Sequence, residues 1–224
     1  MGQAIGEFLP MAVGVAISPV PIIAVILMLF TDRARRDSLA FLLGWIVAMA
    51  LALVVLIALA STRELGAGGD PTDTVSWIKL ILGVLLILLA VKEWRRRPAP
   101  GTEATMPAWM ERIDSMKPVA ALGLALVLSL VNPKNLLLIA GGAIAIAQSD
   151  LSSSETAVAI LTFTVIGAIG VATPTLGYLF KGSDVQPTLD RAKAWLAANN
   201  TAVMAVIVLV IGVSLFGKGL GALI

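Results

Sequence analysis

Asn132, Pro133 and Lys134 follow one another inside the apolar stretch SLVNPKNLLLIAGG, residues 129–142. Each brings chemistry that hydrocarbon does not supply. Proline has no backbone N–H, so it leaves a carbonyl of the preceding turn unpaired. Asparagine donates and accepts hydrogen bonds, and the lysine ammonium is a cation with three donors. Together they could bind an anion in apolar surroundings, and Asn135 adds a donor unless one helical step turns it away.

A second polar residue followed by proline occurs in ISPVPIIAVILML, residues 17–29. Ser18 offers a hydroxyl there, and Pro19 and Pro21 again remove backbone donors. The half-helix N-termini that follow such breaks offer partial positive charge to an anion. Kinks at proline are also common without any ligand, so each break alone has a purely structural interpretation. Our candidate substrate-binding residues are Ser18, Pro19, Pro21, Asn132, Pro133, Lys134 and Asn135.

The composition decides which solvent surrounds these residues. The chain has 224 residues, of which 58% are hydrophobic and 13% charged, and its mean hydropathy is +0.97. Soluble proteins carry about 25% charged residues, so this chain lacks the polar surface of a soluble fold. Apolar runs of about 18 or more residues are typical of membrane spans. The composition therefore predicts an integral membrane protein.

Six apolar stretches are continuous rather than alternating, which predicts helices and not a β-barrel. We predict an all-α integral membrane protein with six transmembrane helices, the first and fourth of them discontinuous at their prolines. The predicted spans are Phe8–Phe30, Leu39–Ala60, Val75–Val91, Pro118–Ala147, Ala157–Phe180 and Ala202–Leu220.

Lys134 lies near the middle of the fourth predicted span, roughly 20 Å from either end at ~1.5 Å per residue. A lysine at that depth costs at least ~2.5–3.5 kcal/mol and usually lines a pathway. No Asp or Glu occupies the middle of any span. Lys134 is therefore held by carbonyls, deprotonated or neutralised by an arriving anion, and we favour the anion. Lys79, near the end of its span, is more typical of an interfacial anchor.

The distribution of basic residues predicts the orientation, because Lys and Arg concentrate in cytoplasmic loops. The second and fourth loops and the C-terminus together hold only Arg63 and Lys218. We therefore predict a multi-pass protein of the bacterial cell (inner) membrane with both termini extracytoplasmic. The first, third and fifth loops hold Arg33, Arg35, Arg36, Arg95, Arg96, Arg97, Arg112, Lys117, Lys181, Arg191 and Lys193.

The chain reads as one polytopic membrane domain, 1–224, that divides near its middle. Residues 1–94 and 118–224 each hold three spans, and the cytoplasmic linker 95–117 joins them. Three-span halves insert in opposite senses, so the recurrent proline breaks indicate two inverted three-helix repeats, a pattern typical of transporters. Gly-Val-x-Leu also recurs in the last span of each half, at residues 83–86 and 212–215.

Two further patterns concern surfaces. The stretches 107–116 and 189–200 each mix a Trp with charges at helical spacing, which fits either an interfacial helix or a solvated helix leading into the next span. Gly217 and Gly221 have the spacing of a close helix contact and suggest a homodimer.

Several function classes are excluded by the residue types. There is no Cys or His, so thiolate or imidazole metal sites and histidine catalysis are impossible. With no carboxylate inside a span, we expect no enzyme activity, no metal, no cofactor and no nucleic-acid partner. The Gly-rich Lys-Ser/Thr motif of ATP-driven proteins is missing, so transport would be ion-coupled, passive or driven by a partner.

The motifs of the whole chain resemble one family. They are ISPVPIIAVILML, FLLGW, WIKLILGVLLILLAVKEWRRR, VNPKNLLL and AWLAANNTAVMAVIVLVIGVSLFGKGL. The chain resembles the Sap/GAP family of actinobacterial membrane proteins, the sulfolipid- and glycopeptidolipid-addressing proteins of the LysE superfamily. That resemblance implies a six-span, exporter-like protein linked to delivery of glycolipids to the cell envelope.

The residues and the resemblance together predict a transporter that moves an anionic amphiphile, a membrane lipid or glycolipid, outward to the envelope. Two alternatives stay open. One is an exporter of small, amino-acid-like metabolites of the LysE type. The other is a non-transporting accessory protein of a larger lipid-export machinery.

Overall fold

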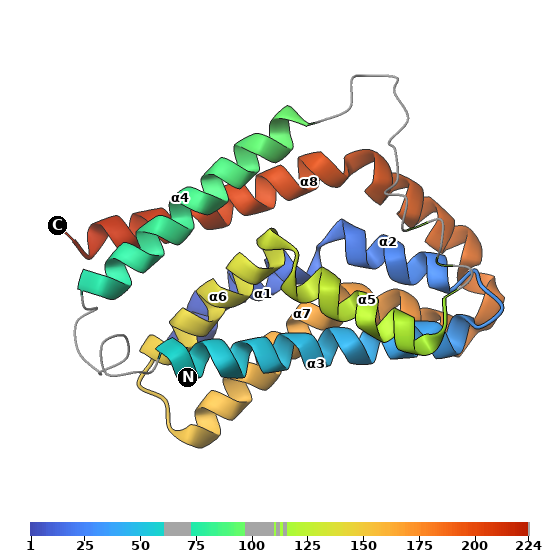
Figure 1. Cartoon of the computed structure of the whole chain (residues 1–224), viewed down its shortest axis with the longest axis horizontal. Coiled ribbons are helices and arrows are strands. Elements are labelled where there is room, and N and C mark those ends of the chain that lie inside the picture. The colour runs from blue at the N-terminus through green and yellow to red at the C-terminus, as the bar shows by residue number, and fades with distance from the viewer. Residues whose placement is uncertain (61–72, 97–109, 111–112, 114–115, 224) are drawn as a thin grey trace.

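The computed structural model describes residues 1–60, 73–96, 110, 113 and 116–223, and these ranges contain no β-strand. Figure 1 shows a bundle in which α4 and α8 cross along one side of the other helices. In chain order the helices are α1 (Gly2–Ala16), α2 (Pro19–Met28), α3 (Ala34–Ala60), α4 (Asp73–Arg95), α5 (Pro118–Leu130), α6 (Pro133–Gln148), α7 (Ser153–Lys181), the 3-10 helix η2 (Gly182–Val185) and α8 (Gln186–Gly221).

The helices are long and apolar enough for a membrane protein. Three stretches qualify alone, Ala34–Ala60, Val75–Arg95 and Ser153–Gly221, and two bent pairs raise the number of candidate spans to as many as five. The pairs are α1 with α2, bent by 46°, and α5 with α6, bent by 67°. Six spans were predicted. The count is lower because η2 joins α7 and α8 into one helical stretch of 69 residues.

The exposed side chains of α3 indicate that the helix faces lipid. Leu43, Leu51 and Val55 are each more than half exposed, whereas Trp45 and Met49 on the opposite face are fully buried. An exposed apolar stripe of this length is rare on a soluble monomer and is typical of a lipid-facing surface. The described residues thus form an all-helical membrane protein whose exposed side chains along α3 are apolar.

Helix α1 lies antiparallel to α6. A Cβ built on Gly14 would meet Leu138, and one built on Gly141 would meet Met11. From the first contact to the second, the position in α1 moves toward its N-terminus and the position in α6 moves toward its C-terminus. The two helices therefore run in opposite directions. The Phe8 and Phe163 rings, with centroids 5.9 Å apart, extend this core to α7.

Glycines bring α4 and α8 into backbone contact. Cβ atoms built on Gly83, Gly212 or Gly219 would fall within 3.0 Å of backbone atoms of the opposite helix. In contrast, no atom of the described residues lies within 4 Å of a Cβ built on Gly217 or Gly221. The glycine pair suggested for a homodimer therefore faces open space, and the homodimer itself stays a prediction.

Charged side chains gather at the two ends of the bundle. Glu7 of α1 lies 3.9 Å from Lys218 of α8 and lines one cavity with Lys79 of α4; we call this the terminal end, since both chain termini lie there (Figure 1). At the opposite, basic end, Arg33, Arg35 and Arg36 line a cavity of about 390 Å³ with Tyr178.

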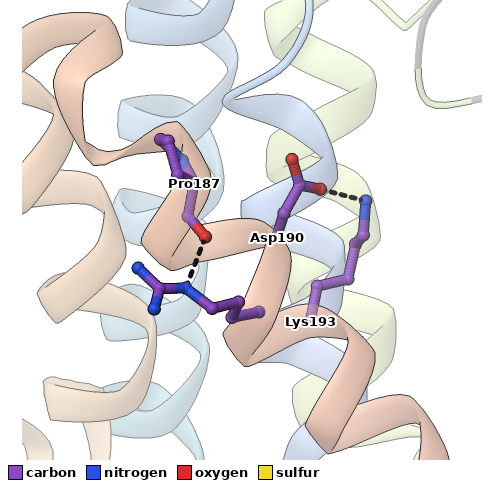
Figure 2. A network of polar contacts seen from close by, with 4 residues as sticks. Pro187, Asp190 and Lys193 are labelled. Carbon is purple, nitrogen blue, oxygen red and sulfur yellow. Dashed lines mark hydrogen bonds and ion pairs between the residues drawn. The ribbon is translucent and has the colours of Figure 1, made fainter.

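The amphipathic stretch 189–200 forms the first turns of α8 at the basic end. Leu189 packs with Ile26 of α2 and with Leu29, the residue after α2, in a small buried cluster. Figure 2 shows Lys193 paired with Asp190, at 2.9 Å, and Lys193 also lies 4.9 Å from the centre of the Phe30 ring. Because the helix continues into the apolar part of α8, the structure favours the interpretation of a helix leading into the last span. The other stretch, 107–116, falls largely outside the described residues.

Candidate functional site

The helix breaks expected at the prolines are present, and their backbone geometry matches. Ser18 precedes α2 with φ −70° and ψ 112°, and Asn132 precedes α6 with φ −69° and ψ 113°. Both are extended conformations immediately followed by a proline at the first position of the helix, where its missing N–H costs nothing. Each break thus ends one helix and starts another within the same bent pair.

The register between α1 and α6 brings these two breaks to the same level. Gly14 faces Leu138 and Met11 faces Gly141, so the two residue numbers in each pair have the same sum. Ser18 follows the C-terminal end of α1 and Lys134 lies in the first turn of α6, so the antiparallel arrangement brings both residues to the same end of the pair. We call this region, where the two breaks meet, the junction.

Lys134 is buried at the junction. Its residue is 4% exposed, and within the described part of the chain no atom accepts a hydrogen bond from its Nζ. The two ion pairs among the described residues, Lys193–Asp190 and Lys218–Glu7, lie elsewhere. A buried ammonium without a partner is strongly unfavourable. An anion bound beside the Lys134 ammonium would therefore be stabilised.

Asparagine side chains stabilise the α5–α6 break, one by capping α6 and one by linking α6 to α5. Asn132 Oδ1 accepts a hydrogen bond of 3.1 Å from the backbone N–H of Lys134. Asn135 Nδ2 donates to the carbonyl oxygen of Leu128, also at 3.1 Å, and so satisfies an acceptor that the end of α5 leaves free. The donor expected of Asn135 is used inside the chain, and its Oδ1 has no hydrogen-bond partner among the described residues.

The predicted site residues differ in burial. Ser18, Pro19, Pro21, Lys134 and Asn135 are buried, whereas Asn132 is half-buried and Pro133 is exposed. Pro133 therefore shapes the break from its outer side. That any of these residues binds substrate stays a prediction.

Ser129 is a polar residue of the junction that the sequence did not single out. It lies in the last turn of α5, fully buried, and its Oγ has no hydrogen-bond partner among the described residues. The sequence feature that could have revealed Ser129 is its spacing, because it precedes Asn132 by three residues in the same apolar stretch. Ser18 Oγ is likewise buried and unpartnered. We define the junction cluster as Ser18, Ser129, Lys134 and Asn135.

Helix α7 supports the junction from a third side. The carbonyl oxygen of Ala16, in the last turn of α1, lies directly against Gly170, where a Cβ would collide with it. Trp45 Nε1 of α3 donates to the carbonyl oxygen of Gly167, one turn earlier in α7, at 3.2 Å. The end of α1 is thus fixed between α6 and α7, which positions Ser18.

Lys79, predicted as an interfacial anchor, lies at the terminal end of the bundle, and its role as an anchor stays a prediction. It lines a cavity of about 490 Å³ at the terminal end, together with Glu7, Gln148 and Asp150. The Oε1 atom of Gln148 is buried without a partner among the described residues. This cavity lies at the start of α1 and the end of α6, which is the opposite end of the pair from the junction.

The family assignment covers both breaks. The sequence model of the family described as Sap, sulfolipid-1-addressing protein, matches residues 8–221. No curated protein and no solved structure matches the chain. The family's description, together with several long apolar helices, indicates a lipid-related role in a membrane. The chain belongs to the Sap, sulfolipid-1-addressing protein, family.

Proposed function

We propose that the protein is a membrane transporter that moves an anionic amphiphile, a lipid or glycolipid, toward the cell envelope. One observation carries the proposal: Lys134 is buried within a bent helix pair, and no atom of the described chain accepts a hydrogen bond from its Nζ. Ionisable residues at such positions usually mark substrate pathways. An anion that binds during transport would supply the partner. The family's lipid-related description names the class of anion.

The proposed role is not enzymatic. The junction cluster offers one ammonium, two hydroxyls and an amide oxygen, which suit binding of an anionic, hydroxyl-bearing headgroup. It contains no carboxylate or imidazole that could serve as a general base. The partners we propose are the lipid or glycolipid itself and a larger lipid-export machinery that could drive its transport.

Six spans in two inverted three-helix halves form part of the proposal. The stretch Ser153–Gly221 has 69 residues, about 100 Å of helix, whereas one crossing of the hydrocarbon core needs ~30 Å. Two crossings, α7 and α8 with the turn at η2, account for that length. With α1–α2 and α5–α6 as one span each, residues 1–94 and 118–224 hold three spans apiece.

The contact between α4 and α8 supports a two-fold relation between the halves. A Cβ on Gly83 would lie 2.8 Å from the Gly212 carbonyl oxygen, and a Cβ on Gly212 would lie 3.1 Å from that of Gly83. Gly83 also faces Phe216, four residues after Gly212, while Gly212 faces Ile87, four residues after Gly83. Reciprocal contacts of this kind are characteristic of a two-fold axis. The matched angles at Ser18 and Asn132 support the same relation.

The proposed orientation in the cell membrane gives a labelling prediction. The basic end should be cytoplasmic and the terminal end extracytoplasmic, because basic residues remain on the cytoplasmic side. A Ser152→Cys variant should react with an impermeant maleimide in intact cells, while Arg35→Cys and Arg191→Cys should react only after permeabilisation. The parent chain has no Cys and should stay unlabelled. Asp70 and Arg97, expected outside and inside respectively, lie outside the described residues. Labelling of position 152 only from the cytoplasm would overturn the orientation.

Transport itself can be measured in vesicles. The purified protein would be reconstituted with phosphatidylglycerol that carries an acyl-linked nitrobenzoxadiazole, and dithionite would bleach the outer leaflet. We expect the anionic lipid to cross faster than in protein-free vesicles and faster than labelled phosphatidylcholine. If neither lipid crosses faster than in protein-free vesicles, with or without a proton gradient, the transporter proposal is wrong and the accessory role replaces it. Release of trapped amino acids alone would indicate the small-metabolite exporter.

A further inference from the structure

A lipid-facing groove separates α4 and α8 beyond their glycine contact. The helices touch at Gly83 and Gly212 and diverge toward the C-terminal end of α4 (Figure 1). The groove there has a volume of about 350 Å³, and its lining is almost entirely apolar. It is lined by Ala90, Val91, Trp94 and Arg95 of α4 and by Ala205, Val206 and Leu209 of α8.

The shape of the groove follows from the size of its side chains. Ala90 and Ala205, both 3% exposed, form a floor of methyl groups, and the larger side chains form the walls. Val91, Trp94, Val206 and Leu209 are all between 42% and 53% exposed. A channel with a small floor and branched or aromatic walls is the shape that an extended acyl chain fills.

Basic side chains lie at one end of the groove. Arg95 lines it, and Lys92 and Arg96 belong to the same turns of the helix end. Both ion pairs formed by described residues involve other side chains, so Arg95 has no carboxylate partner among them. Glu93, the carboxylate of this turn, is not one of the lining residues. Trp and Arg at the end of a membrane helix lie at headgroup depth.

We propose that this groove binds one acyl chain of an anionic membrane lipid, with the lipid headgroup at Arg95. The charge complementarity selects an anionic headgroup, and the apolar lining holds the chain. In the proposed orientation the site opens to the cytoplasmic leaflet. The inference rests on the proposed function, because it assumes that the bound lipid is the amphiphile that is transported.

Brominated lipids test the site without transport, so this inference and the transport proposal can fail separately. The protein would be reconstituted in vesicles containing equal fractions of brominated phosphatidylglycerol or brominated phosphatidylcholine. The Trp94 contribution is the difference between the parent and Trp94→Phe. We expect the brominated anionic lipid to quench Trp94 at least two-fold more strongly. Arg95→Gln should remove that preference, whereas Arg36→Gln, at another basic loop, should keep it.

Two matched valines on α8 test the groove itself. Val206 lines the groove and Val213, two turns later, does not, although both are 53% exposed. Val206→Phe should reduce quenching of Trp94 by the anionic lipid to the level given by phosphatidylcholine, and Val213→Phe should leave it unchanged. Equal quenching by the two lipids in the parent, or a preference that survives Arg95→Gln, would overturn the proposal.

Discussion

Replacement of Lys134 by Ala should abolish movement of the anionic lipid while folded protein accumulates in the membrane at the parental level or above it. The ammonium is buried and unpartnered among the described residues. Its removal therefore relieves a cost of at least ~2.5–3.5 kcal/mol on insertion scales. Loss of transport without loss of stability separates a binding role from a folding role. The measurements are the vesicle assay, the amount of protein in the membrane and the thermal unfolding temperature.

Other substitutions at the same position refine the expectation. Lys134→Arg keeps a cation but loses the compact ammonium, so it should retain lipid binding and impair a proton-coupled step. Lys134→Glu should be the most damaging, because it repels an anion. Lys117→Ala is the matched control, since Lys117 is exposed at the start of the same bent pair. Parental transport by Lys134→Ala would make this lysine a structural residue and would remove the central argument for the site.

The helix breaks were predictable because their causes are local. A proline removes its own backbone donor wherever the chain lies, so Pro19 and Pro133 mark helix starts from the sequence alone. The membrane class follows equally directly from composition. The number of spans does not, because η2 continues the helical path from α7 into α8, so a turn predicted between two spans lies inside one helical stretch.

The partners of the junction could not be predicted, because they depend on contacts between distant segments. Nothing in the sequence shows that Asn135 donates to Leu128 or that Ala16 lies against Gly170. The position of Lys79 in a cavity with Glu7 depends on how α1 and α4 pack, so spacing along one helix could not show it. The sequence indicated Ser18, Lys134 and Asn135 but not Ser129, and packing determined which of their atoms remain without partners among the described residues.

The Gly170→Ala substitution should destabilise the protein strongly, although alanine is the better helix former. The added methyl group would collide with the carbonyl oxygen of Ala16, which is backbone and cannot move as a flexible side chain could. Overpacking of this kind costs about 1–3 kcal/mol, more than the ~1 kcal/mol that glycine to alanine gains in an open helix. Since Ala16 ends α1 two residues before Ser18, the junction should shift as well, and lipid movement should fall together with the unfolding temperature.

Gly177→Ala provides the control in the same helix, because no atom in the described part of the chain lies within 4 Å of a Cβ built there. That variant should unfold at the parental temperature or slightly above it and should transport normally. Thermal unfolding and vesicle assays on the two variants measure the difference directly. If Gly170→Ala is as stable and as active as Gly177→Ala, α1 does not lie against α7 as described, and the packing that fixes the end of α1 before Ser18 is wrong.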